Sequence, residues 1–185
     1  ILDGLVGSEM CIRDRDSMPP FLGGGEMIQD VYLDHSTWAD LPYKFEAGTP
    51  AIGEAVGMGA ALNYLEQIGL ENIAAWEAEL TLHLFNRLQG IDGLRILGPT
   101  PQQQPERGAL ATFLVDGVHA NDIAAMLDLA GICIRSGHHC CQPLHRHYQV
   151  TGSARASLSF ITTTAEIDRF ADELQGVITF FRDNS

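Results

Sequence analysis

The amino-acid sequence predicts an α+β or α/β fold in which helices pack on a small sheet. Short apolar runs bounded by glycine, proline or polar residues recur along the chain, as strands require. Longer segments between them carry apolar residues at helical spacing. The predicted order is two helices followed by strand, strand, helix, strand, loop, strand and helix. With 185 residues the chain is long enough to bury a core.

The first part of the sequence predicts little regular structure before its first long helix. Residues 18–49 are predicted to be irregular chain around one or two strands, and residues 27–33 alternate nearly as a strand does. Thr49 can then cap a helix, Pro50 suits the first helical position, and Gly69 can end it. The small residues of this helix favour close burial.

The next segment predicts a second helix and two strands. Residues 70–88 form a helix whose apolar stripe should face the core. The stripe consists of Ile73, Trp76, Leu80, Leu84 and Leu88. Residues 94–97 and 109–115 predict strands, with a polar loop at 99–108 between them.

The last part of the chain completes the predicted sheet. Residues 122–129 predict a helix that Gly131 ends, and residues 132–134 and 156–160 predict short strands. A final helix begins at about Thr164, because Thr163 and Glu166 have the spacing of a capping box. Its inward side chains are expected to be Ile167, Phe170, Leu174, Val177, Ile178 and Phe181.

A concentration of reactive groups follows the strand predicted at 132–134. Residues 135–144 read Arg-Ser-Gly-His-His-Cys-Cys-Gln-Pro-Leu, and Pro143 is expected to stop regular structure. Only a thiolate attacks electrophiles, and nearby cations raise the thiolate fraction. Cys140 or Cys141 is therefore a candidate nucleophile. The alternative is that the cysteines are packing residues and the histidines lie on the surface.

A metal site is a second interpretation of the same residues. The possible zinc ligands are Cys133, His138, His139, Cys140, Cys141, His145 and His147. Adjacent residues in extended chain point to opposite sides, and the i, i+2 spacing of His145 and His147 is not that of a zinc pair. We assign no metal ligand, and a zinc-binding or thiol-redox module remains the alternative class of function.

Composition excludes several partners. The net charge of −13 argues against nucleic acid and anionic membrane, which are bound by clustered lysine and arginine. Four cysteines, two of them adjacent, do not form a pattern typical of secreted disulfide scaffolds. No apolar run approaches the roughly 20 residues that span a bilayer. These features predict a cytoplasmic protein.

The sequence of residues 135–144 resembles the active-site loop of the Suf-type (group II) cysteine desulfurases, which are pyridoxal-phosphate enzymes of the class V aminotransferase family. Residues 18–28, 44–50 and 153–158 resemble further motifs of that family, in the same order. The resemblance implies the α+β small domain of the fold type I pyridoxal-phosphate transferases, with part of the large domain.

The resemblance also implies domain boundaries. Residues 69–185 correspond to the C-terminal small domain with the active-site cysteine loop. Residues 18–68 correspond to a remnant of the large cofactor-binding domain and a connecting helix. Residues 1–17 do not resemble the family, and we interpret them as an artefactual leader, in which Cys11 has no function.

The family's functional residues map onto five positions of this chain. The resemblance implies that Cys140 takes sulfur from L-cysteine as a persulfide, leaving alanine, and that Arg155 holds the substrate's α-carboxylate. Arg135 matches a second arginine of the site. Thr49, with Gly48 before it, matches the threonine that reaches the cofactor phosphate of the opposite subunit. A guanidinium fork suits a carboxylate and a helix N-terminus suits a phosphate, although ordinary surface and capping roles are the alternatives.

The resemblance implies partners as well. The family forms homodimers and commonly passes its sulfur to a SufE- or SufU-type acceptor for iron-sulfur cluster assembly. A selenocysteine lyase or another class V aminotransferase would share most of the motifs. The role of Cys141, whose thiol could compete for the persulfide, stays open.

The lysine content limits what the chain can do alone. Lys44 is the single lysine of the sequence. In the family, the lysine that anchors pyridoxal 5'-phosphate lies in a His-Lys motif upstream of the position of Met18, and Lys44 matches a variable basic position. We therefore expect a C-terminal fragment that lacks the anchoring lysine and cannot turn over by itself.

Overall fold

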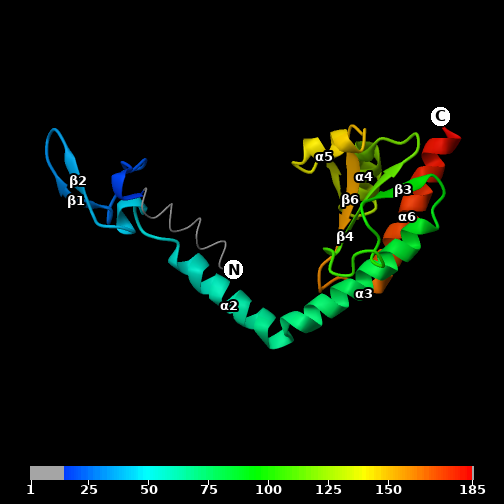
Figure 1. Ribbon diagram of the computed structural model, residues 1–185, viewed down its shortest axis with the longest axis horizontal. Helices are drawn as coiled ribbons and strands as arrows, with labels where there is room; N and C mark the ends of the chain where they lie inside the picture. The colour runs from blue at the N-terminus through cyan, green and yellow to red at the C-terminus, as the bar shows by residue number, and fades with distance from the viewer. Residues whose placement is uncertain (1–14, 185) are drawn as a thin grey trace. The chain divides into compact units, whose positions relative to one another are not determined.

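The computed structural model describes residues 15–184 (Figure 1). The chain divides between Leu65 and Glu66 into two compact units. The interpretation of residues 1–17 as a leader falls almost wholly outside the described residues. No helix within residues 15–184 is both long enough and apolar enough to cross a bilayer.

The first unit contains a small antiparallel ribbon and the beginning of a long helix. Strand β1 (Ile28–Val31) pairs with β2 (Ser36–Trp38), which confirms a strand within residues 27–33. A short 3-10 helix, η1 (Tyr43–Phe45), follows.

Helix α2 (Ile52–Ile68) begins two residues after Pro50 and ends before Gly69, whose φ of 90° suits a glycine. The prediction that α2 is closely buried is wrong for the described residues, because none of its residues is buried. Its apolar side chains are distributed around the helix and form no single stripe that could face a core.

The second unit is a four-stranded sheet with three helices packed on one face and a short fourth helix over the other. The sheet order is β3-β4-β6-β5, and every neighbouring pair is antiparallel. The strands are β3 (Leu94–Leu97), β4 (Leu110–Val115), β5 (Arg135–Gly137) and β6 (Ser153–Ser157). The helices are α3 (Leu70–Gln89), α4 (Ala120–Leu129), α5 (Gln142–His147) and α6 (Thr164–Asp183). This arrangement confirms the predicted fold class.

The core lies between one face of the sheet and α3, α4 and α6. Along β4 the residues alternate, with Ala111, Phe113 and Val115 buried and their neighbours half-buried. Ala154 and Ala156 of β6 join the same core cluster. Helices α3 and α6 lie side by side (Figure 1). One face of the sheet is therefore buried under the helices, and the opposite face carries Thr112, Ser153 and Arg155.

The predicted helical stripes are largely confirmed. Leu80, Leu84 and Leu88 of α3 are fully buried, whereas Trp76 remains 37% exposed and donates from Nε1 to the carbonyl oxygen of Thr162 at 3.3 Å. In α6 the predicted inward residues are buried except Phe181, which packs at the edge of the core. The capping box of Thr163 and Glu166 is present with both of its hydrogen bonds.

Two strands lie at other positions than predicted. The strand expected at 132–134 forms at Arg135–Gly137, and the strand expected at 156–160 forms at Ser153–Ser157. Ile132 and Ile134 do pack against the core, but the hydrogen-bonded ladder forms three residues later, where β5 meets β6. Arg155 consequently lies within a strand and not before one.

The prediction that Pro143 ends regular structure is also wrong. Pro143 lies in the first turn of helix α5. A proline is tolerated there because the first N–H groups of a helix have no partner within the helix. The end of the reactive loop, residues 142–144, lies in helix α5, over the face of the sheet that α3, α4 and α6 do not cover.

Candidate functional site

Two arginines face each other across β5 and β6. Arg135 of β5 is the register partner of Arg155 of β6, so their side chains leave the same face of the sheet. Like charges directly opposite in a sheet are destabilising, and an anion between them removes that cost. Arg155 Nε is buried without a hydrogen-bond partner among the described residues. The pair is therefore suited to bind a carboxylate.

Cys140 lies beside this pair. Arg135 Nη2 donates to Cys140 Sγ at 3.3 Å, and the Cys140 side chain is exposed. His139 and Cys140 both have positive φ, 51° and 59°, which turns the chain sharply after β5. The strain of this turn is offset by the hydrogen bond from Cys141 N to His138 O at 2.8 Å. The turn presents the Cys140 thiol in an open pocket with Arg135, His138 and Gln142.

His139 anchors the turn to the sheet. Its Nε2 donates to the carbonyl oxygen of Ser153 at 3.1 Å. Burial lowers the pKa of His139 below its ordinary 6.5, and the positive charge of Arg155 lowers it further, against the opposing effect of the Ser153 hydrogen bond. His139 is therefore neutral at pH 7, with its proton on Nε2.

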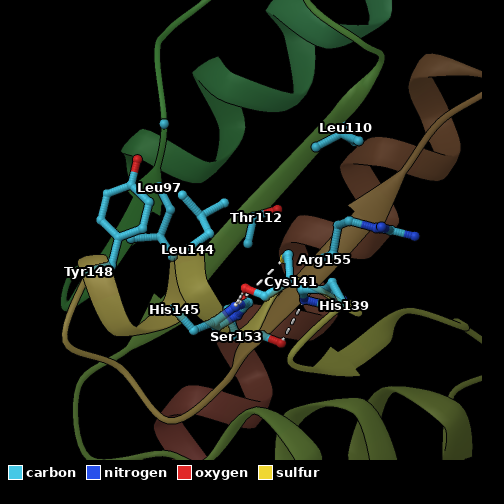
Figure 2. Close-up of a pocket in the computed structure, with 11 residues that line it drawn as sticks. Leu97, Leu110, Thr112, His139, Cys141, Leu144, His145, Tyr148, Ser153 and Arg155 are labelled. Atoms are coloured by element: carbon cyan, nitrogen blue, oxygen red, sulfur yellow. Dashed lines mark hydrogen bonds between the residues drawn. The ribbon is translucent and has the colours of Figure 1, made fainter.

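A second thiol faces a different set of groups. Cys141 Sγ donates to His138 O at 3.1 Å and lies 3.7 Å from His145 Nδ1. His145 Nε2 lies 2.9 Å from Ser153 Oγ, and both residues are buried. Cys141, His145 and Ser153 line a cavity of about 230 Å³. Figure 2 shows these three residues close together among the residues that line it.

The structure brings together three of the five predicted site residues. Arg135 faces Arg155 across β5 and β6, and Cys140 lies beside Arg135. Gly48 and Thr49 belong to the first unit, where Gly48 has φ 84° and its N–H donates to Gly25 O at 2.9 Å. Thr49 is exposed, ahead of α2.

Two groups of the site, His145 and Ser153, are not predicted from the sequence. There His145 is only a possible zinc ligand, and Ser153 has no predicted site role. The i, i+4 spacing of Cys141 and His145 is the signal that places them on one helical face, but it carries meaning only if this segment is helical.

The described residues fit a carboxylate but not the covalent attachment of pyridoxal phosphate. The single lysine, Lys44, donates from Nζ to the carbonyl oxygens of Arg15 at 3.4 Å and Asp16 at 3.0 Å. It also lies over the ring of Phe45. Within residues 15–184, no three His, Cys, Asp or Glu side chains are arranged to hold a metal ion.

Comparisons with known proteins identify the family to which the chain is similar. The family model described as aminotransferase class-V matches residues 9–170. A probable cysteine desulfurase from Synechocystis sp. is 56% identical over 169 residues, which cover 91% of this chain and 40% of that protein. A cysteine desulfurase from Haloferax volcanii is 43% identical over 166 residues, which cover 90% of this chain and 38% of that protein.

A solved structure gives the same result. The cysteine desulfurase CsdA from Escherichia coli matches with a TM-score of 0.74 at 31% identity, over 88% of this chain and 39% of that chain. The chain thus spans about 40% of the length of the curated relatives that it matches.

Proposed function

The chain belongs to the class-V aminotransferase family, and from this membership we propose that it forms the sulfur-accepting part of a cysteine desulfurase. The observation that carries the proposal is the position of the Cys140 thiol, 3.3 Å from Arg135 Nη2 and beside the Arg135–Arg155 pair. A nucleophilic sulfur next to a carboxylate-binding pair is what the removal of sulfur from an amino acid requires.

Each residue has a distinct role in this proposal. Arg155, with Arg135 beside it, binds the α-carboxylate of L-cysteine in a fixed orientation. The Cys140 thiolate attacks the substrate's sulfur, a sulfur–sulfur bond forms and the substrate's carbon–sulfur bond breaks. The electron pair of the broken bond stays with the carbon, which takes up a proton, so that alanine leaves and Cys140 holds the sulfur as a persulfide. His139 stays neutral and fixes the turn that carries Cys140.

Pyridoxal phosphate, when bound, supplies the electron sink that allows a carbon–sulfur bond to break. We propose no step for Lys44, whose ammonium group is already bound to carbonyl oxygens. Thr49, next to Gly48 and ahead of α2, is proposed to bind the cofactor phosphate in a homodimer. A SufE- or SufU-type acceptor would then take the persulfide sulfur for iron-sulfur cluster assembly in the cytoplasm.

The proposal can be tested in a chimera. Residues 18–185 replace the matching segment of the Synechocystis relative, and alanine and sulfide are measured with L-cysteine and pyridoxal phosphate. Cys140→Ser is expected to abolish both products, whereas Cys141→Ser is the matched control and should retain them. Equal activity of the two variants would remove Cys140 from its role. A preference for selenocysteine over cysteine would identify a selenocysteine lyase instead.

The same chimera tests the carboxylate site. Arg155→Lys keeps the positive charge but loses the fork that binds both carboxylate oxygens. We expect kcat/KM for L-cysteine to fall about 10- to 150-fold, since hydrogen bonds to charged groups contribute about 1.5–3 kcal/mol. An unchanged kcat/KM would show that Arg155 does not touch the substrate.

The chain by itself is expected to release no sulfide from L-cysteine when pyridoxal phosphate is added. A Schiff-base absorption band near roughly 420 nm that Lys44→Ala abolishes would contradict this expectation.

A further inference from the structure

The two adjacent thiols of the loop line two different pockets. Cys140 lines the open pocket that Arg135 and His138 share, and Cys141 lines the cavity that contains His145 and Ser153. We propose that Cys141 is a second reactive thiol, with His145 as its proton acceptor, and that its cavity admits small uncharged apolar or aromatic disulfides. This inference does not depend on the desulfurase activity proposed for Cys140.

His145 is held in position to act on Cys141. Its Nδ1 lies 3.7 Å from Cys141 Sγ, and its Nε2 lies 2.9 Å from Ser153 Oγ. Nδ1 also lies 3.2 Å from the carbonyl oxygen of Cys141, which can only accept a hydrogen bond. If the proton is on Nε2, it is donated to Ser153 and Nδ1 can take the thiol proton, after which the new Nδ1–H group faces both the carbonyl oxygen and the sulfur of Cys141. If the proton is on Nδ1, it can be donated to the thiolate. Either tautomer places an Nδ1–H group opposite the ionised sulfur.

Burial of His145 and Ser153 holds the imidazole ring beside Cys141. His145 is 4% exposed and Ser153 is 0% exposed, so the imidazole has little freedom to turn away from Cys141. Helix α5 fixes the pair further, because Cys141 is the residue before its first turn and His145 lies four positions on.

The rest of the cavity indicates which molecules it takes. Its walls are largely apolar. They include Leu97 of β3, Leu110 of β4, Leu144 of α5 and the ring of Tyr148, which follows α5. Figure 2 shows the Arg155 side chain directed away from Leu97 and Tyr148. Arg155 also lines the cavity, but its guanidinium is directed away from this apolar wall, and the wall therefore favours an uncharged ligand.

The proposed reaction is thiol–disulfide exchange. The Cys141 proton moves to His145 Nδ1, the thiolate attacks one sulfur of the disulfide, and the disulfide bond breaks. Cys141 is then held in a mixed disulfide, and the released thiolate takes the proton back from His145. Cys141 sulfur is oxidised and the released half of the reagent is reduced, so no other oxidant is needed.

The experiment uses the 185-residue chain with Cys11→Ser, Cys133→Ser and Cys140→Ser, which leaves Cys141 as the single thiol. The probe is the neutral aromatic disulfide dithiodipyridine, whose released thiopyridone is followed by absorbance at pH 7. The control chain carries Cys133 as its single thiol, because Cys133 is exposed and lies outside the cavity. We expect Cys141 to react faster than Cys133. Equal or slower reaction of Cys141 would overturn the proposal.

His145→Asn tests the proton acceptor. The rate of Cys141 is expected to fall about fivefold to 30-fold, since an ordinary thiol is only about 3% ionised at pH 7. An unchanged rate in this variant would remove His145 from its role.

Leu97→Phe tests the cavity without touching His145. The added ring is expected to slow dithiodipyridine about tenfold or more, while the small reagent methyl methanethiosulfonate keeps its rate. The ratio of the two rates is insensitive to thiol ionisation and to loss of His145. An unchanged ratio would show that the aromatic disulfide does not enter the cavity, and a preference for the anionic dithiobis(nitrobenzoate) would contradict an uncharged ligand.

Discussion

Ser153→Ala is expected to destabilise the second unit by about 1–3 kcal/mol. Ser153 is fully buried, and its Oγ lies 2.9 Å from His145 Nε2. His145 is itself 4% exposed, so water cannot replace the lost hydroxyl. The variant leaves a buried imidazole nitrogen without a partner, and the cost of such an unsatisfied polar group sets the magnitude.

Urea unfolding followed by tryptophan fluorescence measures this effect. The chain has two tryptophans, and Trp38→Phe leaves Trp76 of α3 as the reporter of the second unit. We expect a lower transition midpoint with an unchanged m-value. Ser157→Ala is the matched control, because Ser157 lies on the same strand and is exposed, and its effect should stay within about 0.5 kcal/mol. Equal effects of the two substitutions would refute the reasoning.

Three further predictions concern the cap of α6 and the loss of stability in acid. Thr163→Ala should lower the free energy of unfolding by about 1 kcal/mol, since Thr163 Oγ1 accepts from Glu166 N; an unchanged urea midpoint would contradict this. The backbone and side-chain hydrogen bonds of Thr163 lower the pKa of Glu166 below 4.5, so its contribution is present above that pH and lost below it. Glu166→Gln should therefore lose less stability on acidification than the parent chain. The pKa of His139 is also lowered, so the parent chain loses stability as the pH falls below 6.5, where the unfolded chain binds a proton more readily. His139→Gln should reduce that loss. Urea unfolding at several pH values measures it.

Much of the core could be predicted from local patterns. The stripe of Leu80, Leu84 and Leu88 and the capping box at Thr163 are periodic or short-range signals, and each specifies its element without reference to the rest of the fold. The composition of residues 135–144 likewise indicated a reactive loop, because thiols next to arginine and histidine are rare as simple packing.

The wrong predictions around the reactive loop concern where a strand pairs and where the chain starts a new helix. Apolar residues at 132–134 predicted a strand, but the ladder forms at Arg135–Gly137 because that segment reaches β6. The sequence predicts that Pro143 ends regular structure, yet at a helix start its missing N–H costs nothing. His145 could not be paired with Cys141 until helix α5, which begins directly after Cys141, was known.

The sequence by itself determined the core stripes of α3 and α6 and the loop that carries the reactive groups, because periodicity, caps and residue chemistry act over a few neighbouring positions. Only the tertiary structure decided that Arg135 faces Arg155, that Ser153 supports His145, and that Cys140 and Cys141 line separate pockets. Those relations depend on the β5–β6 register and on the left-handed backbone of His139 and Cys140, which no local pattern in the chain specifies.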